Sequence, residues 1–298
     1  MIDWYILAFI SAFFSAAAAI YEKKVLFKEK ALSFSALFAV INFFLAIPFF
    51  FFINYAGLSD LGLTVVLIKS FFEAAAFLCV MMGIKNLELS AALPLLVLTP
   101  GLVAIFAFLT LGEALTGLQI LGIILLIIGT YTLQVEGKQL KGKKKFDFFR
   151  PFKVFANSKG YYYILAALLL FTTTSILDKA ILSNFKVSLN AFMGFQHLFL
   201  AIIFMLIVIF SGKSSHLKHA FKFSGKLILL ISIFTIIYRY TQLSAVKIAP
   251  VALVLSIKRI SVFFAVLIGG RMFKEHNLII RTIATAIMVA GAILVILY

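Results

Sequence analysis

The stretch that decides the fold is residues 189–210, which read LNAFMGFQHLFLAIIFMLIVIF. It contains no Asp, Glu, Lys or Arg, and as an α-helix it is long enough to cross about 30 Å of hydrocarbon. Because lipid offers no hydrogen-bond partner to the backbone, an apolar segment of this kind must be helical. The sequence therefore predicts a membrane-spanning helix here.

Apolar runs of similar length recur along the whole chain. We expect ten helices, over residues 4–21, 34–53, 63–84, 90–110, 116–134, 161–178, 189–210, 226–246, 250–269 and 277–297. The alternating ten-residue segments that are typical of membrane β-barrels do not occur. The predicted fold class is an all-α membrane protein with ten transmembrane helices, and the expected location is the cell membrane.

Composition agrees with a lipid environment. Hydrophobic residues make up 64% of the 298 positions and charged residues 13%, whereas a soluble domain is nearer half apolar and a quarter charged. The formal net charge is +16, but Lys and Arg stand mainly between the apolar runs, which is typical of cytoplasmic loops. We therefore expect lipids as partners and no nucleic acid. The oligomeric state stays open, with a monomer as one option.

The second half of the chain repeats the first. Matching residues that lie 162 positions apart are Lys85 with Lys247, Thr99 with Ser261, Glu113 with Glu275 and Gly129 with Gly291. At the ends of the first and sixth helices the offset is 156, where Glu22-Lys23 matches Asp178-Lys179, and a longer loop after the seventh helix accounts for the difference. We predict a first repeat over 1–134, a basic linker over 135–160 and a second repeat over 161–298.

Each predicted repeat has five helices. Because five is odd, the second repeat must enter the membrane in the orientation opposite to the first. Inverted repeats around a central cavity are the architecture of many secondary transporters, in which exchanging the conformations of the halves moves the opening from one side to the other. The repeat therefore predicts transport.

Short motifs between the fourth and fifth helices resemble a known family. They are LGEAL at 111–115, LG at 121–122 and IGTY at 128–131, with Phe273-Lys274-Glu275 and Ala290-Gly291 as counterparts in the second half. Together they resemble the EamA branch of the drug/metabolite transporter superfamily. The resemblance implies ten helices around a cavity formed largely by the first, third, fourth, sixth, eighth and ninth.

The loops after the first, third, fifth, seventh and ninth helices carry most of the Lys and Arg residues. The other side has only Lys179, Lys186 and Lys247. The positive-inside rule then predicts a cytoplasmic linker and external termini. Members of the resembled family are expected to have cytoplasmic termini instead, so the orientation stays open.

Five charged residues fall deep within the predicted helices. They are Lys69, Glu73, Arg239, Lys258 and Arg259. Each costs about 2.5–3.5 kcal/mol at the bilayer centre on insertion scales, so each should face a partner or a wet cavity. Lys69 precedes Glu73 by four residues, which predicts a local pair on one helix face.

Among these charged residues, Lys258 and Arg259 give the most specific indication of function. The first repeat has Leu96 and Val97 at the matching positions, so the fold does not need the pair. Two clustered cations suit an anionic ligand, with Arg offering a two-pronged fork and Lys a point charge. The alternative is structural: Glu73 could neutralise one of them, or Arg239, and join the two halves.

A second, shorter resemblance concerns the segments IKRISV at 257–262 and DKA at 178–180. They resemble the ninth- and sixth-helix segments of the sugar-phosphate/phosphate translocator branch. That resemblance implies that Lys179, Lys258 and Arg259 converge on an anionic group.

The candidate site residues fall into two groups. The substrate-binding candidates are Lys258, Arg259, Lys179, Arg239, Glu73 and Tyr238. Candidates for coupling or gating are Glu73, His197, Glu113 and Glu275, the last two of which are expected at helix ends. No catalytic triad, metal-ligand spacing or phosphate-binding glycine loop occurs, so we expect no enzyme activity, cofactor or metal.

The function that these observations favour is secondary transport of a small organic metabolite, anionic or zwitterionic, by alternating access. The alternative is a membrane scaffold, or an enzyme that acts on lipid-linked substrates. Import, export, proton coupling and exchange are not distinguished at this stage.

Overall fold

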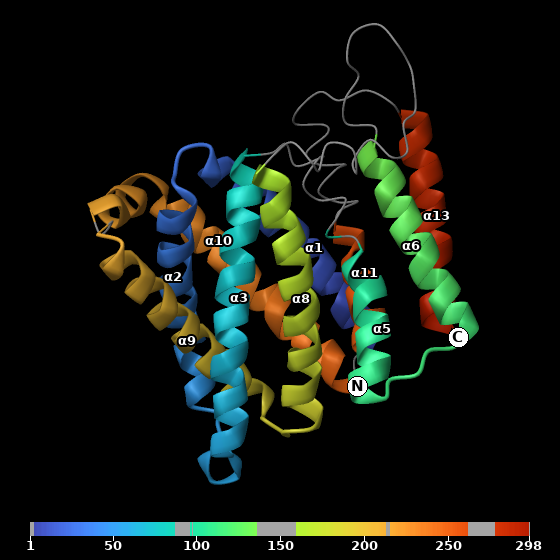
Figure 1. The fold of residues 1–298 in the computed structure, drawn as a ribbon, viewed down its shortest axis with the longest axis horizontal. Coiled ribbons are helices and arrows are strands. Elements are labelled where there is room, and N and C mark those ends of the chain that lie inside the picture. Colours follow the sequence, from blue (N-terminus) through green and yellow to red (C-terminus); the bar gives the residue numbers. More distant parts are fainter. Residues whose placement is uncertain are drawn as a thin grey trace, which may run out of the picture.

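The computed structural model describes residues 3–86, 96, 98–135, 159–212, 215–261 and 278–297, and these ranges are helical apart from short turns and connections (Figure 1). The first half contains α1 (Trp4–Leu26), α2 (Ala31–Phe50), the 3₁₀ turn η1 (Tyr55–Gly57), α3 (Asp60–Asn86), α5 (Thr99–Leu111) and α6 (Gly117–Val135). The second half contains α8 (Lys159–Ser183), α9 (Leu189–Phe210), α10 (Ser215–Ile248), α11 (Val251–Lys258) and α13 (Leu278–Leu297).

Membrane-spanning character is carried by helices in both halves. Within the described ranges, six helices are long and apolar enough to cross a bilayer, namely α1, α2, α3, α8, α9 and α10, and shorter apolar helices occur in α5, α6 and α13. No strand occurs in these ranges, so the all-α, multi-pass membrane class is confirmed. The count of ten spans and the inversion of the halves stay predictions.

Several helix boundaries differ from those expected. Helix α10 begins at Ser215 and not near 226, so part of the predicted basic loop is helical. Helix α5 begins at Thr99 with Pro100 in its first turn, where proline costs no hydrogen bond and starts the helix without kinking it. Residues 262–277, which include the end of the predicted ninth helix, lie outside the described residues.

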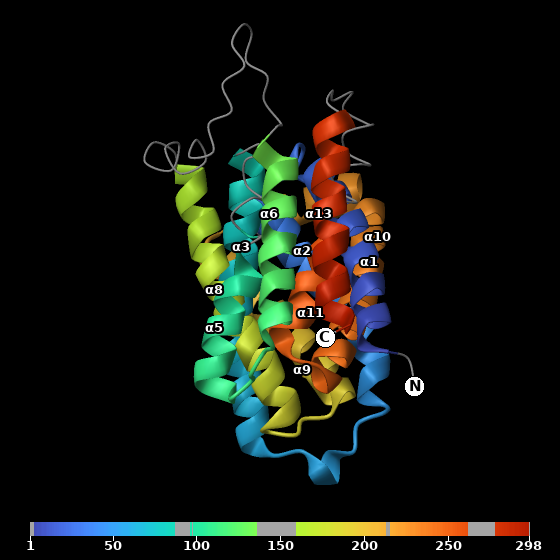
Figure 2. The same ribbon diagram turned by 90° about the vertical axis from the view of Figure 1, so that its right-hand side faces the viewer.

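The helices pack mainly across the two halves. The most extensive contacts join α6 with α13, α1 with α10, α3 with α8, and α2 with α9. Exchanging the halves maps α1 onto α8 and α10 onto α3, so the contact of α1 with α10 maps onto the contact of α8 with α3. Figure 2 shows α6 and α13 side by side. These contacts are symmetric under exchange of the halves, and the inversion of the repeats stays a prediction.

Small residues set the close approach of α6 and α13. A Cβ atom on Gly122 would lie 2.7 Å from the Gly291 carbonyl oxygen. In the same way, a Cβ atom on Gly291 would lie 2.7 Å from the Gly122 carbonyl oxygen. A Cβ atom on Gly129 would lie 2.9 Å from the Ala284 carbonyl oxygen. At the repeat offset, Gly122 matches Ala284 and Gly129 matches Gly291, so the two close contacts are equivalent. Close backbone approach through small residues is a common way to pack helices in lipid.

Replacing Gly122 by alanine is expected to destabilise the protein by about 1–3 kcal/mol, the usual cost of overpacking, because backbone atoms leave no room for the methyl group. The measurement is thermal unfolding of the detergent-solubilised protein, followed by size-exclusion chromatography. Gly117→Ala is the matched control, since nothing lies within 4 Å of its added Cβ atom. Equal unfolding temperatures for the two variants would contradict this packing.

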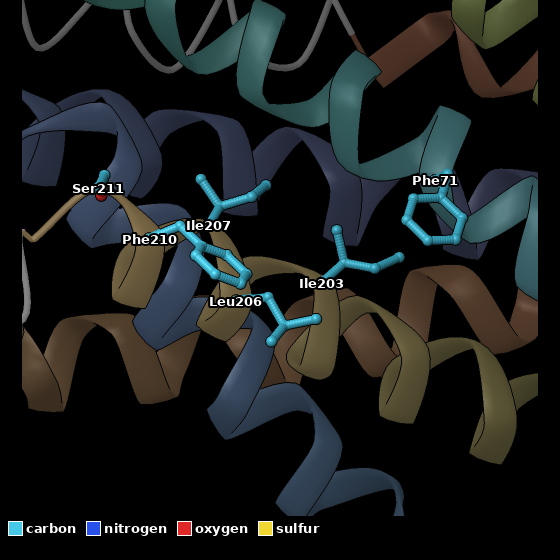
Figure 3. A pocket seen from close by; sticks show the side chains of 6 residues that line it. All are labelled: Phe71, Ile203, Leu206, Ile207, Phe210 and Ser211. Carbon is cyan, nitrogen blue, oxygen red and sulfur yellow. The ribbon is translucent and has the colours of Figure 1, made fainter.

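The outer surface of the bundle is strongly apolar. Phe210 is 86% exposed and Phe51 is 82% exposed, which suits contact with lipid chains. Between α3 and α9 lies an open groove (Figure 3). Its lining is Phe71, Ile203, Leu206, Ile207, Phe210 and Ser211. Because no charged side chain lines this groove, it does not suit an anionic solute.

The end of α6 and the beginning of α8 both lie at the upper side of the bundle in Figure 1, and the other end of each helix lies lower. Val135 and Lys159, which flank the predicted linker, are therefore on the same side. Several charged side chains, among them Lys69, Asp178 and Arg239, are buried in the interior of the bundle.

Candidate functional site

A network of four charged side chains lies inside the bundle. Helix α3 supplies Lys69 and Glu73, α8 supplies Asp178 and α10 supplies Arg239. The Lys69 ammonium lies 2.9 Å from Glu73 Oε2 and 3.0 Å from Asp178 Oδ1, and Arg239 Nη1 lies 3.3 Å from Asp178 Oδ2. The Lys69 side chain is fully buried. Two cations and two carboxylates make this network neutral, which offsets part of the cost of burying them.

Helix α9 completes the surroundings of this network. Gln196 Oε1 accepts a hydrogen bond of 3.2 Å from Arg239 Nη2, and the Phe192 ring lies 5.3 Å from the Lys69 ammonium. His197 is also buried, and its Nε2 has no hydrogen-bond partner in the part of the chain that the structure describes. The coupling role of His197 stays a prediction.

Two of the predicted substrate ligands, Glu73 and Arg239, have ion-pair partners within the protein. Glu73 pairs with Lys69, as the four-residue spacing predicted, and Arg239 pairs with Asp178. Among the ion pairs of the described residues, Glu73 contacts Lys69 and not Arg239 or the ninth-helix cations, but the network does join the two halves, as the structural alternative expected. Glu73 and Arg239 are held by protein partners, and their substrate roles stay predictions.

Lys258 and Arg259 stand where α11 ends. The preceding residues 251–257 are buried, whereas Lys258 and Arg259 are partly exposed. The Lys258 ammonium donates to Gln242 Oε1 and lies 4.7 Å from the centre of the Tyr238 ring. Both contacts come from α10, which fixes the position of this lysine.

Arg259 reaches the other half of the chain. Its Nη2 donates a hydrogen bond of 2.7 Å to Thr99 Oγ1, at the start of α5. Neither Arg259 nor Lys258 forms an ion pair within the described ranges, since their hydrogen-bond acceptors are a neutral amide and a hydroxyl. In this respect the pair differs from Lys69 and Arg239.

Glu22 is a buried carboxylate that sequence reasoning did not place in the site. It lies on α1, is 7% exposed, and interacts electrostatically with Lys258 and Tyr238. No hydrogen bond or ion pair joins it to another described residue. Its repeat counterpart Asp178, by contrast, pairs with both Lys69 and Arg239.

Both acids were matched by the repeat but assigned to helix ends, because the predicted first and sixth helices ended at 21 and 178. Helix α1 continues to Leu26 and α8 continues to Ser183. The repeat match was therefore the signal that could have identified Glu22 and Asp178 as interior residues. Gln242 and Thr99 were not proposed as site residues from the sequence.

A second polar junction ties four helices together. The Lys179 ammonium donates to the carbonyl oxygens of Val246 and Ala249, each at 2.9 Å, and lies 3.3 Å from Glu113 Oε1. Glu113 Oε2 accepts a 2.9 Å hydrogen bond from the Val251 backbone N–H. The junction joins α5 and α8 with the end of α10 and the beginning of α11.

This junction gives Lys179 partners within the protein, and its predicted role in substrate binding stays a prediction. The resemblance to phosphate translocators implied that Lys179 meets Lys258 and Arg259, but its contacts are with Glu113 and two backbone carbonyls. The carbonyls at the end of α10 attract the ammonium because they have no partner within their own helix. Glu113 lies between the end of α5 and the beginning of α6, as predicted. Its role as a gate stays a prediction. Glu275 lies outside the described residues.

No metal centre is formed by the described residues. Among them, no group of three or more His, Cys, Asp or Glu side chains is placed to hold an ion.

An all-helical bundle with an apolar outer surface and a charged interior defines a multi-pass membrane protein. Residues 2–134 match the model of the EamA-like transporter family, so this part of the chain is similar to that family. The resemblance seen in the motifs at 111–131 is thereby confirmed. The function that this match suggests is membrane transport.

A solved structure titled "Crystal structure of protein" has a similar fold. It superposes with a TM-score of 0.73 over 99% of this chain and 96% of that chain, at 18% sequence identity. At this identity the likeness concerns the fold alone. No curated protein matches the sequence.

Proposed function

We propose that this membrane transporter moves small organic anions by alternating access, and that Lys258 and Arg259 bind the anionic group. One observation carries the proposal. Lys69, Arg239 and Lys179 each pair with a carboxylate, whereas Lys258 and Arg259 contact only neutral acceptors in the described part of the chain. Their charge is available to a ligand.

The surroundings of the pair suit an anion. A guanidinium offers two parallel donors to a carboxylate or phosphate, and an ammonium offers a mobile point charge beside it. Thr99, which Arg259 contacts, is the first residue of α5, and the N-terminal end of a helix carries a positive partial charge. When an anion binds, its oxygen atoms would replace Gln242 Oε1 and Thr99 Oγ1 as the hydrogen-bond acceptors of Lys258 and Arg259.

Alternating access is supported by the way the halves meet. The junction of Lys179 and Glu113 joins α5 and α8 with α10 and α11, so separating these helices requires this ion pair to break. Interfaces between related halves of this kind open and close in secondary transporters. We place the protein in the cell membrane, where such carriers act.

Counterflow in proteoliposomes tests this function. Vesicles containing the purified protein are preloaded in turn with monocarboxylates, phosphorylated metabolites, zwitterionic amino acids and organic cations, and uptake of the labelled solute is measured. We expect flux for an anion or a zwitterion and none for cations. Cation flux combined with indifference to every anion would refute the charge argument, and absence of flux for all classes would favour the scaffold or enzyme alternative.

A further inference from the structure

Helices α5 and α11 are joined to each other at both ends. At one end Arg259, which follows α11, donates the 2.7 Å hydrogen bond to Thr99, the first residue of α5. At the other end the backbone N–H of Val251, the first residue of α11, donates a 2.9 Å hydrogen bond to Glu113, which follows α5. The two helices, one from each half of the chain, therefore run antiparallel, and they pack against each other.

The two joints differ in how they respond to an anion. Glu113 is itself a carboxylate and is also held by the Lys179 ammonium at 3.3 Å, so an anion gains little by displacing it. Thr99, by contrast, offers Arg259 a neutral hydroxyl. A carboxylate or phosphate forms a stronger hydrogen bond with a guanidinium than a hydroxyl does. Of these two joints, the one at Thr99 is therefore the one that an anionic solute can open.

The hydroxyl of Thr99 is fixed as an acceptor. It donates its own proton to the Leu96 carbonyl oxygen at 2.6 Å, so a lone pair faces the Arg259 guanidinium. Thr99 is also buried, with 1% of its surface exposed. In the empty site this hydroxyl holds Arg259 against the first half of the chain.

We propose that Thr99 is a positioning residue that holds Arg259 in the empty site and yields it to the solute, so that anion binding releases the beginning of α5 from α11. The inference rests on the proposed function, in which Arg259 binds the anionic group. Because Thr99 and Arg259 belong to different halves, the exchange of acceptors that binds the solute also removes a bond between the halves. The solute therefore favours the state in which the halves can separate.

Thr99→Val tests this role because it should strengthen anion binding. Valine has nearly the shape of threonine but cannot accept a hydrogen bond, so the solute no longer competes with the protein for Arg259. Loss of one competing hydrogen bond predicts a dissociation constant about threefold to tenfold lower than that of wild type. A residue that contacts the solute directly, or that only starts α5, would weaken binding when substituted.

The measurement is isothermal titration calorimetry of the detergent-solubilised protein with pyruvate and with glycerol 3-phosphate, which supply a carboxylate and a phosphate group. Thr99→Ser keeps the hydroxyl and should keep the wild-type affinity. Thr172→Val makes the same chemical change at another buried threonine, whose hydroxyl bonds the Leu168 carbonyl of its own helix, and should also keep it. Affinity of Thr99→Val equal to or weaker than that of wild type would overturn the inference.

A second measurement follows the release of α5. Amide hydrogen exchange of residues 99–111 is compared with that of residues 189–210 in α9 as the internal reference. We expect the bound anion to speed exchange in α5 of wild type, and exchange in Thr99→Val to be fast without it. Unchanged or slower exchange in α5 of wild type when the anion binds would contradict the release.

The results also separate this inference from the proposed function. If wild type binds a probe and the double variant Lys258→Leu, Arg259→Leu does not, the anion site stands. In that case an affinity of Thr99→Val no tighter than that of wild type shows that only the role of Thr99 is wrong. If wild type binds neither probe, both proposals are wrong.

Discussion

Replacing Lys258 and Arg259 together by leucine is expected to reduce anion counterflow by about 100-fold or more. Hydrogen bonds to charged groups contribute about 1.5–3 kcal/mol each, and the double variant removes both donors from the solute. The fold should persist, because no described carboxylate loses an ion-pair partner when the two cations go. Flux is measured in proteoliposomes, with thermal unfolding measured on the same preparations.

The matched control for this experiment removes two cations elsewhere. Lys222 and Lys226 are exposed on α10, four residues apart, and replacing both by leucine should leave flux within about twofold of wild type. Should the variant of Lys258 and Arg259 transport as well as this control, the ninth-helix pair is structural and the proposed site is wrong.

Asp178→Asn is expected to have the largest effect on stability. Asp178 contacts both Lys69 and Arg239, so the substitution leaves two buried cations facing one remaining carboxylate, Glu73. Removing one partner from a buried ion pair costs about 3–5 kcal/mol, because the other charge stays buried without compensation. The expected result is a marked fall in unfolding temperature and in the yield of monodisperse protein.

A second substitution tests whether the stability lost in Asp178→Asn comes from the unbalanced charge or only from the lost contacts. Adding Arg239→Gln to Asp178→Asn restores a neutral set, and it should recover part of the lost stability. Asp60→Asn is the control, since Asp60 is exposed at the beginning of α3. A variant Asp178→Asn as stable as this control would show that the network does not stabilise the fold.

The helices could be predicted because the length of an apolar run is set by the thickness of the bilayer. The expected range 189–210 coincides with α9. The same criterion fails where a helix continues through charged residues, as α1 does past Glu22 and α8 past Asp178. Such residues stay helical when the neighbouring helices supply partners, and hydropathy along one segment does not include those neighbours.

The site could be predicted only as a set of unusual residues. Lys258 and Arg259 were recognised because charges are costly in lipid and the matching positions in the first repeat are apolar. Which cation pairs with which acid depends on helix packing, so the partners Asp178, Gln242 and Thr99 could not be read from spacing. Only Lys69 with Glu73 was predictable, since both lie on one helix face.

Lys179 illustrates the limit of a short resemblance. Its three-residue motif matches the sixth-helix lysine of phosphate translocators, but the ammonium lies with Glu113 and the carbonyls that end α10. A side chain as long and flexible as that of lysine takes the nearest acceptors, and those are set by tertiary structure.

The central claim is that the transported anion binds to Lys258 and Arg259. The most direct measurement is a crystal structure with a bromine-labelled carboxylate that the protein transports, located by anomalous scattering. The account predicts a bound carboxylate within hydrogen-bond distance of the Lys258 ammonium and the Arg259 guanidinium. A carboxylate bound at Lys179, or in the basic loops, with none at the ninth-helix pair, would contradict it.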